Sequence, residues 1–267
     1  GHVHTTCSEG LLDPEQVVDL ALKKNIDGID ITDHDTILGV EPAIAYSNKV
    51  GNIKVIPGIE FGCIFRNEEV HILGYFIDYK EKKIIDITKR LRRNRIARGL
   101  EMIKKINDLG MELTTDEVKK LSKKDYIGRP HIARALINRG YVTSIQDAFN
   151  KWLNRGMPAY VERDTLTLVE TINLIHESNG IAVLAHPGLL IDKDIIYYCI
   201  DNRIDGLEVI HSKHNDEDVK SLIEISRKLG VIITGGSDCH GHIIDGDYLL
   251  GKYYIDIYDI PIMKGRI

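Results

Sequence analysis

Along the first 80 residues, two patterns of hydrophobic positions alternate. Short, nearly continuous apolar runs predict buried strands, and longer stretches with apolar residues every three or four positions predict helices. Asp13 and Pro14 mark the start of the first helix, because they suit an N-cap and the first helical position. In chain order the sequence predicts a helix at residues 13–24, a strand at 26–32, a helix at 40–50, and strands at 54–56 and 70–77.

The spacing changes near residue 81, and the alternation returns near residue 167. In between it is helical throughout, with predicted helices at residues 82–109, 115–121, 130–138 and 144–154. Afterwards the sequence predicts a helix from residue 167 to about 180, strands at 181–185, 206–210 and 231–234, and a helix at 216–229. Strands that alternate with helices predict an α/β fold with parallel strands inside. We expect residues 1–80 and 165–267 to form a barrel domain and residues 81–164 a helical insert.

Composition is ordinary for a globular protein and limits the classes of function. A chain of 267 residues, 43% of them hydrophobic, can bury the core of one large α/β domain. The net charge of −5 gives no basic field for a long nucleic-acid duplex. The sequence has no apolar run long enough for a membrane span and no visible signal peptide. The four cysteines are widely spaced, which argues against a disulfide framework and indicates a reducing, cytoplasmic location.

Histidine and carboxylate side chains collect near the ends of the predicted strands. His2 with His4, and Asp238 with His240, have the two-residue spacing that places both side chains on one side of an extended segment. Further candidates near other strands are His34, Glu60, His71 and His186. The carboxyl ends of barrel strands converge on one face, and imidazole with carboxylate suits manganese, iron or zinc. The number of candidates predicts two or three divalent ions rather than one.

Each of these residues also has an ordinary interpretation. A single histidine near a strand end is usually a polar residue with a local hydrogen-bond partner and not a metal ligand. Two spaced pairs together with further groups on one predicted face are harder to explain in that way. The set as a whole, and no single member of it, therefore predicts the metal centre.

Several short motifs carry a resemblance to a known family. They are GHVHTTCSEG at residues 1–10, TDHDT at 32–36, PGIE at 57–60, AHP at 185–187 and SDCH at 237–240. Together they resemble the motifs of the polymerase and histidinol phosphatase (PHP) family over nearly the whole chain. The resemblance implies a distorted (β/α)7 TIM-like barrel, a trinuclear metal centre and phosphoester hydrolysis. The insert, with GRPHIAR at 128–134, resembles the branch that acts on nucleoside monophosphates, nucleoside 3′,5′-bisphosphates and short RNA 5′ ends.

The resemblance also implies how the ligands are shared among the ions. It assigns the first ion to His2, His4, Glu60 and Asp238. It assigns the second ion to Glu60, which bridges, with His71 and His186. It assigns the third ion to Glu9, His34 and His240. The family usually has aspartate where this chain has Glu9, so we expect a looser third site. Manganese is the expected metal, with iron or zinc as alternatives.

Glu60 and Asp238 are the predicted catalytic carboxylates. They would hold the ions that generate a hydroxide nucleophile and offset the charge on the phosphoryl group. Asp33 is expected to orient the imidazole of His34. This mechanism needs no covalent serine or cysteine nucleophile.

Substrate contacts are expected mainly from the insert. Arg129 is the candidate phosphate clamp, and Arg134 and His131 are further candidates. His214 could bind phosphate or protonate the leaving oxygen. The ordinary alternatives are a solvated arginine at a helix start for Arg129 and a loop histidine for His214.

The leading hypothesis is a metal-dependent phosphoesterase that hydrolyses a phosphate monoester of a nucleotide: a nucleoside 3′,5′-bisphosphate, AMP or a short RNA 5′ end. Its partner would be a small phosphorylated substrate, with no long duplex and no membrane. A histidinol-phosphate phosphatase is the second enzymatic hypothesis, against which the long insert argues. A barrel that binds metal for stability or for a protein partner, without turnover, is the third.

Overall fold

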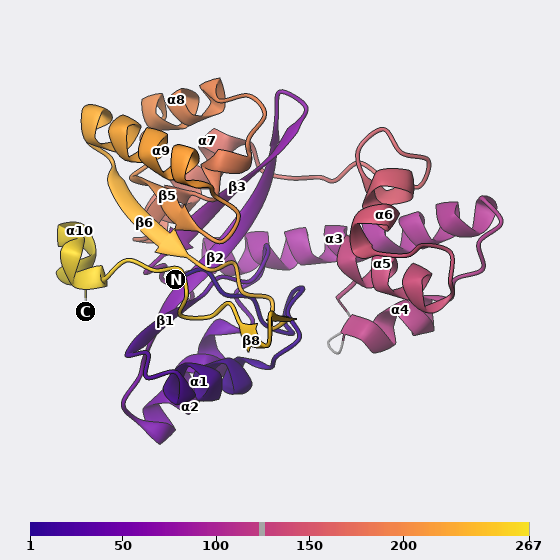
Figure 1. Cartoon of the computed structure of the whole chain (residues 1–267), viewed down its shortest axis with the longest axis horizontal. Helices are drawn as coiled ribbons and strands as arrows, with labels where there is room; N and C mark the ends of the chain where they lie inside the picture. Colours follow the sequence, from indigo (N-terminus) through magenta and orange to yellow (C-terminus); the bar gives the residue numbers. More distant parts are fainter. Residues whose placement is uncertain (123–125, 267) are drawn as a thin grey trace.

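The computed structural model describes residues 1–122 and 126–266 and shows a mixed α/β fold built on one curled sheet (Figure 1). The sheet has six strands in the spatial order β1 to β6. They are β1 (Gly28–Ile31), β2 (Lys54–Phe65), β3 (Glu68–Tyr75), β4 (Ile181–Leu184), β5 (Gly206–His211) and β6 (Ile232–Gly236). A small hairpin follows, with β7 (Ile243–Ile244) and β8 (Asp247–Tyr248). The alternating hydrophobic pattern therefore predicted the α/β class correctly.

The helices fall into two groups. Those that accompany the sheet are α1 (Pro14–Lys23), α2 (Val40–Val50), α7 (Leu168–Glu177), α8 (Asp194–Asp201) and α9 (Asp216–Leu229). Those between β3 and β4 are α3 (Lys82–Asp108), α4 (Thr115–Ser122), α5 (Arg129–Asn138), α6 (Ile145–Ala148) and the π-helix η1 (Phe149–Leu153). Short helical turns are η2 (Pro187–Leu189), η3 (Ile257–Asp259) and α10 (Pro261–Lys264). Within the described residues, no helix combines the length and the apolar character that a membrane crossing requires.

The prediction of parallel strands is wrong for β3. This strand pairs antiparallel with both β2 and β4, whereas the other neighbouring pairs are parallel. Arg66 and Asn67 are the whole connection between β2 and β3, and both have positive φ (48° and 67°). A two-residue turn of this kind joins antiparallel strands. The longer β2 also means that Glu60 lies within a strand instead of after one.

The N-terminal segment lies between the first and the last strand of the sheet. Val3 forms isolated parallel bridges with Ile31 of β1 and with Cys239 just after β6. Its side chain is buried in an apolar cluster. His2 and His4, on either side of it, both lie against Glu60. The segment thus places both histidines inside the curl of the sheet.

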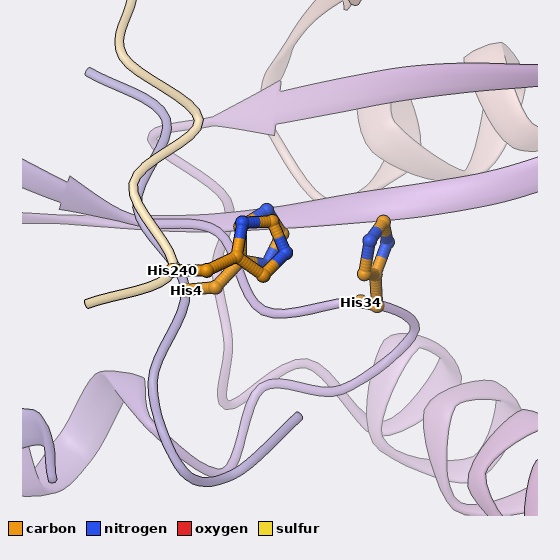
Figure 2. A group of neighbouring side chains, drawn as sticks. All are labelled: His4, His34 and His240. Carbon is orange, nitrogen blue, oxygen red and sulfur yellow. The ribbon is translucent and has the colours of Figure 1, made fainter. Parts of the chain in front are cut away.

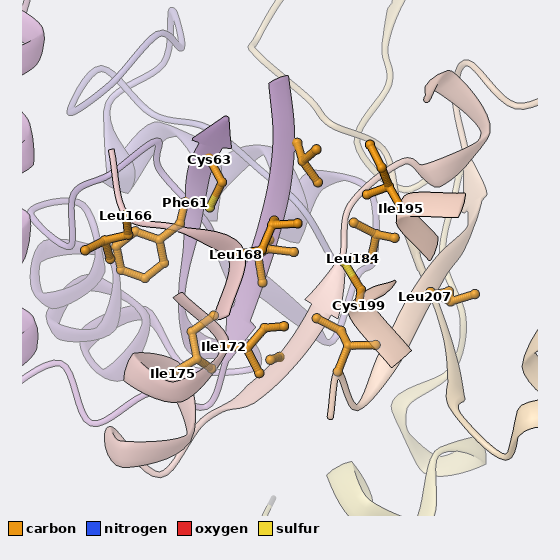
Figure 3. Close-up of a cluster of buried hydrophobic side chains, with 14 of the residues drawn as sticks. Phe61, Cys63, Leu166, Leu168, Ile172, Ile175, Leu184, Ile195, Cys199 and Leu207 are labelled. Carbon is orange, nitrogen blue, oxygen red and sulfur yellow. The ribbon is translucent and has the colours of Figure 1, made fainter. Parts of the chain in front are cut away.

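The main hydrophobic core lies between the sheet and helices α7 and α8 (Figure 3). Ile59 and Phe61 of β2 belong to it, and Ile172 of α7 packs in the same cluster. Side chains alternate along a strand, so Glu60 points away from this core. α7 begins at the predicted capping box, in which Thr167 Oγ1 accepts a hydrogen bond from the backbone N–H of Glu170.

The helices between β3 and β4 enclose a second hydrophobic cluster. Met102 of α3 and Ile132 of α5 are buried in it. The first half of α3 packs instead in the main core, through Ile84 and Leu91. The long helix α3 therefore joins the two cores, and in Figure 1 it runs from the sheet to the other helices of the insert. Residues 123–125, which fall in the predicted insert, lie outside the described residues.

Candidate metal centre

Glu60 lies at the middle of the predicted ligand set, and its side chain is 1% exposed. Distances from its Oε2 atom are 3.1 Å to His4 Nε2, 3.1 Å to His34 Nδ1 and 3.2 Å to His2 Nε2. Distances from its Oε1 atom are 2.8 Å to His71 Nδ1 and 3.3 Å to His186 Nε2. One carboxylate therefore faces imidazoles from distant parts of the chain, as the sequence predicted.

Asp238 supplies a second carboxylate to the same region. It follows β6 with a positive φ of 50°. Distances from its Oδ1 atom are 3.1 Å to His4 Nε2, 3.4 Å to His2 Nε2 and 3.5 Å to His240 Nδ1. His2 and His4 consequently lie between two carboxylates, those of Glu60 and Asp238.

His4, His34 and His240 form a group of three neighbouring imidazoles (Figure 2). The ring centroids of His4 and His240 are 4.2 Å apart, and those of His4 and His34 are 4.5 Å apart. His34 and His240 were predicted to share an ion, and the structure brings them together with His4 between them.

Glu9 does not join the group to which the sequence assigned it. Its Oε1 atom lies 3.4 Å from Arg95 Nη1 of α3. The same oxygen is so close to Gly128, at the start of α5, that a Cβ atom there would collide with it. The carboxylate of Glu9 is directed to the insert by these contacts, and His4 stands beside His34 and His240 in its place.

Four sets of donor atoms are compact enough to hold an ion, since one donor atom from each member lies within 4.8 Å of the others. The sets are His2–His4–Glu60–Asp238, His34–Glu60–His71, His4–His34–His240 and His2–Glu208–His211. Several of their buried atoms lack a hydrogen-bond partner among the described residues: His2 Nε2, His4 Nδ1 and Nε2, His34 Nδ1, Glu60 Oε2 and both ring nitrogens of His71. Buried polar atoms normally have a partner. Imidazole and carboxylate donors suit divalent manganese, iron or zinc, so the residues fit a multinuclear metal centre.

The charges of the centre shift the pKa values of its members. Burial would raise the pKa of Glu60, but the surrounding imidazoles, His34 first among them, hold it well below its usual range. Burial would lower the pKa of His4 and of His71, but adjacent carboxylates raise each to about 9. In the metal-free protein at neutral pH, Glu60 is therefore ionised and both of these histidines carry a proton.

Two buried residues of β5 lie in the same region and were not predicted as site residues. Glu208 Oε1 lies 2.9 Å from His2 Nδ1, and His211 Nε2 lies 3.8 Å from Asp238 Oδ2. Both could have been considered as site residues from the sequence. Glu208 is a charged residue within an otherwise apolar strand. His211 lies at the end of that strand, much as the predicted ligand His186 lies just after the preceding strand.

Asp33 forms hydrogen bonds to the turn near the N-terminus. Its carboxylate accepts hydrogen bonds from Thr5 N at 2.7 Å, Thr5 Oγ1 at 2.6 Å and Ser8 Oγ at 2.5 Å. The predicted hydrogen bond to His34 is not among the contacts of the described residues. Asp33 instead holds the loop that carries His4.

Four arginines of the insert lie near the metal centre: two on α3, one at the start of α5 and one in the segment before α7. We call Arg95, Arg98, Arg129 and Arg163 the arginine layer. Arg129 Nη2 lies 2.6 Å from Glu69 Oε2, and the other oxygen of Glu69 lies 3.5 Å from His71 Nε2. Arg95 Nε donates a hydrogen bond to Asp35 Oδ2 at 2.5 Å. Through Glu69, the predicted phosphate clamp Arg129 reaches the edge of the metal centre.

Within the arginine layer, the surroundings of Arg98 disfavour its positive charge. Burial lowers the pKa of Arg98 to about 10, and the neighbouring cations Arg129 and Arg163 add to that effect. Arg98 and Arg129 line a small cavity together with Arg95 and Gly128. An anion bound in this region would offset the repulsion between the guanidinium groups.

His131 and Arg134, the other predicted contacts of the insert, are engaged in local structure. His131 is buried, and its Nδ1 accepts a hydrogen bond from Gly128 N at 3.1 Å, which caps the start of α5. Arg134 Nη2 lies 2.9 Å from His242 Nε2 and so links α5 to the segment after β6. The Nδ1 atom of His131 is therefore unavailable to a substrate.

His214, the predicted phosphate contact, is hydrogen-bonded within the protein through both ring nitrogens. Its Nδ1 donates a hydrogen bond to Val209 O at 2.8 Å, and its Nε2 accepts one from Gly188 N at 3.0 Å. With both nitrogens occupied, His214 joins the loops after β4 and β5. It has no free nitrogen with which to bind phosphate or to protonate a leaving oxygen.

Solved structures with the same fold are similar over nearly the whole chain. One, described as a metal-dependent phosphoesterase from Bifidobacterium adolescentis, has a TM-score of 0.89 at 28% identity and covers 99% of this chain and 94% of its own. Another, an amidohydrolase from Chromobacterium violaceum with bound sulfate and no metal, has a TM-score of 0.83 at 28% identity. That alignment covers 90% of this chain and 86% of the other.

Relatives with named activities are also similar to this chain over most of its length. The 5′-3′ exoribonuclease Rnm of Salmonella typhimurium is 31% identical over 246 residues, which is 90% of this chain and 84% of the relative. The 3′,5′-nucleoside bisphosphate phosphatase of Chromobacterium violaceum is 29% identical over 246 residues, 90% of this chain and 86% of that protein. The sequence profile of the PHP domain matches residues 1–243. The chain therefore belongs to the PHP domain family, as a metal-dependent phosphoesterase that acts on phosphoric esters.

Proposed function

We propose that this protein hydrolyses a phosphate monoester of a nucleotide: a nucleoside 3′,5′-bisphosphate, AMP or the 5′ end of a short RNA. The observation that carries the proposal is the arginine layer beside the buried metal centre, linked to it through Glu69 and His71. Guanidinium groups next to a cation site suit a substrate that presents phosphate oxygens to both. The named activities of the Salmonella and Chromobacterium relatives belong to this substrate class, and sulfate is bound in a similar structure.

The cofactors of this proposal are two or three divalent ions, with manganese first and iron or zinc as alternatives. His2, His4, Glu60 and Asp238 would hold the first ion. Glu60, His71 and His186 would hold the second, with His34 close to the same carboxylate. His34 and His240 would hold the third, with His4 as the neighbour that the structure places there. When bound, such ions provide Lewis acidity, which lowers the pKa of water and offsets charge on the phosphoryl group.

The residues of the chain have separate roles in this scheme. Glu60 and Asp238 stay ionised at neutral pH, because imidazoles around these buried groups hold the pKa of each carboxyl well below its usual range. They would therefore present negative charge to bound cations. Arg129 would bind phosphate oxygens at the edge of the centre with the guanidinium donors that Glu69 leaves free. Arg134, further along α5, would contact a more distant part of the substrate.

We also propose that the sheet is a distorted (β/α)7 barrel, with the segment at Val3 as its seventh member. The bridges from Val3 to β1 and to the end of β6 support this. In the same proposal, residues 1–80 and 165–267 form the barrel domain and residues 81–164 the insert. The separate apolar cluster of the insert supports that division.

Hydrolysis assays with added manganese test the proposed substrate class. The substrates are adenosine 3′,5′-bisphosphate, AMP and a short 5′-phosphorylated RNA, and histidinol phosphate is the comparison. We expect turnover of at least one nucleotide, lost after chelation and restored by manganese. Turnover of histidinol phosphate alone would favour the second hypothesis. A loaded protein without activity on any phosphoester would favour a metal-stabilised binding protein.

A further inference from the structure

Strand β5 places two fully buried polar side chains, Glu208 and His211, next to the predicted ligands His2, His186 and Asp238. Glu208 is 0% exposed and His211 is 1% exposed. Residues three positions apart face opposite sides of a regular strand. The register of β5 against β6 shifts between Glu208 and Ile210, which marks a bulge. This bulge allows both side chains to face the metal centre, a use of bulges that is common next to active sites.

Glu208 joins two of the predicted ligands with one carboxylate. Its Oε1 atom accepts a hydrogen bond from His2 Nδ1 at 2.9 Å, and its Oε2 atom accepts one from the backbone N–H of His186 at 2.9 Å. His2 and His186 both have left-handed backbone conformations, with φ of 56° and 33°. Such conformations are rare for residues other than glycine and need support from their surroundings. The two hydrogen bonds to Glu208 provide that support.

His211 stands in a similar relation to Asp238. Its Nδ1 accepts a hydrogen bond from Lys213 N at 3.2 Å. The ring proton is therefore on Nε2, which lies 3.8 Å from Asp238 Oδ2. Within the described part of the chain this Nε2 has no hydrogen-bond partner. The N–H of His211 thus lies near the second carboxylate of the centre, at a separation beyond a direct hydrogen bond.

His2, Glu208 and His211 are also compact enough to hold an ion of their own. The hydrogen bonds favour a different role. The Nε2 atom of His2 faces Glu60 and Asp238, so its Nδ1 carries the proton that Glu208 accepts. A carboxylate in this position fixes the tautomer of a ligating imidazole and increases its basicity.

We propose that Glu208 and His211 are positioning residues that set His2, His186 and Asp238 for metal binding. This inference rests on the proposed metal centre but not on the choice of substrate. Gly236 of β6 supports it, because a Cβ atom there would collide with both Glu208 Oε1 and His2 Cβ. Glycine at this position leaves the space in which the histidine and the carboxylate meet.

Metal affinity of the stripped, full-length protein tests the proposal. Wild type, Glu208→Gln and the control Glu170→Gln are titrated with manganese in competition with a chelator, and bound metal is counted at saturation by mass spectrometry. Glu170 is exposed and caps α7 away from the centre. We expect Glu208→Gln to lower affinity by about 10–100-fold at unchanged stoichiometry, with the control at the wild-type value.

Three results would overturn the proposal. Loss of one bound ion in Glu208→Gln would make the residue a ligand, and unchanged affinity would make it merely structural. If this variant does not fold, His211→Asn replaces it, because asparagine retains an acceptor for Lys213 N and removes the ring N–H near Asp238. Unchanged affinity in a folded His211→Asn protein would then be the contrary result. Failure of wild type to hydrolyse any nucleotide would leave the affinity comparison intact and would count against the substrate proposal alone.

Discussion

The metal centre and the arginine layer hold buried charge in different ways. In the arginine layer, Arg95 and Arg129 each have a carboxylate partner, in Asp35 and Glu69. In the metal centre, several buried nitrogen and oxygen atoms approach one another closely and have no hydrogen-bond partner among the described residues. Glu60 Oε2, for instance, faces several ring nitrogens at 3.1–3.2 Å and is bonded to none of them. The donor atoms of the centre are therefore arranged to fit cations, whereas the two arginines are held in place by carboxylates of the chain.

Removal of the central carboxylate should have the largest effect. Glu60→Gln takes away the negative charge that faces five imidazoles. We expect nucleotide turnover to fall by at least about 10³-fold, since a single preorganised electrostatic group is often worth 10²–10³ and this one also holds cations. Circular dichroism should show a retained fold. A variant that binds manganese and turns over normally would remove Glu60 from the centre.

The pH dependence of metal affinity should follow the raised pKa values of His4 and His71. Each is about 9 in the metal-free protein, so at pH 7 a metal ion has to displace a proton from both. Affinity should therefore fall as the pH falls below about 9, by up to about tenfold per pH unit for each displaced proton. Calorimetry in buffers of different ionisation enthalpy counts the released protons. A flat affinity between pH 7 and 9, without proton release, would contradict this account.

The arginine layer should contribute less to catalysis than the metal centre, and it should act mainly through substrate binding. Arg129→Ala is expected to lower kcat/KM by about 10–100-fold, mainly through KM, because it removes a charge-assisted contact to phosphate. Arg139→Ala at the other end of α5 is the matched control, since Arg139 pairs with Glu117 on the surface of the insert. Equal kinetics in the two variants would exclude Arg129 from the site.

His214 should have the smallest effect on catalysis. His214→Ala removes one hydrogen bond to strand β5 and one to the loop after β4, and it should lower the free energy of unfolding by about 1–3 kcal/mol. The shape of the pH–rate profile should stay as in wild type. Loss of one limb of that profile would restore the role that the sequence suggested for His214.

The sequence predicted those parts of the molecule that depend on local spacing. Histidine pairs two residues apart and ligands after apolar strands were recognisable, and the structure brings His2, His4, Glu60 and Asp238 together. The hairpin at Arg66 and Asn67 was not predicted. Both of its strands are apolar runs typical of buried strands, and the hydrophobic pattern of such a run does not reveal whether it pairs parallel or antiparallel.

Contacts between distant segments were harder to predict. Glu208 carried a signal, a charge within an apolar strand, but its partner His2 lies at the other end of the chain. Glu9 could be placed only once the path of α3 was known, since its partner Arg95 comes from that helix. The same holds for His214, whose hydrogen bond with Gly188 depends on the meeting of the loops after β4 and β5.

The most direct measurement is anomalous X-ray scattering from crystals of the protein soaked in manganese. The account predicts two or three strong peaks around the Glu60 carboxylate, each within bonding distance of the imidazole nitrogens and carboxylate oxygens named above. Well-diffracting, manganese-saturated crystals with no anomalous peak there, or with peaks only on the surface, would contradict it.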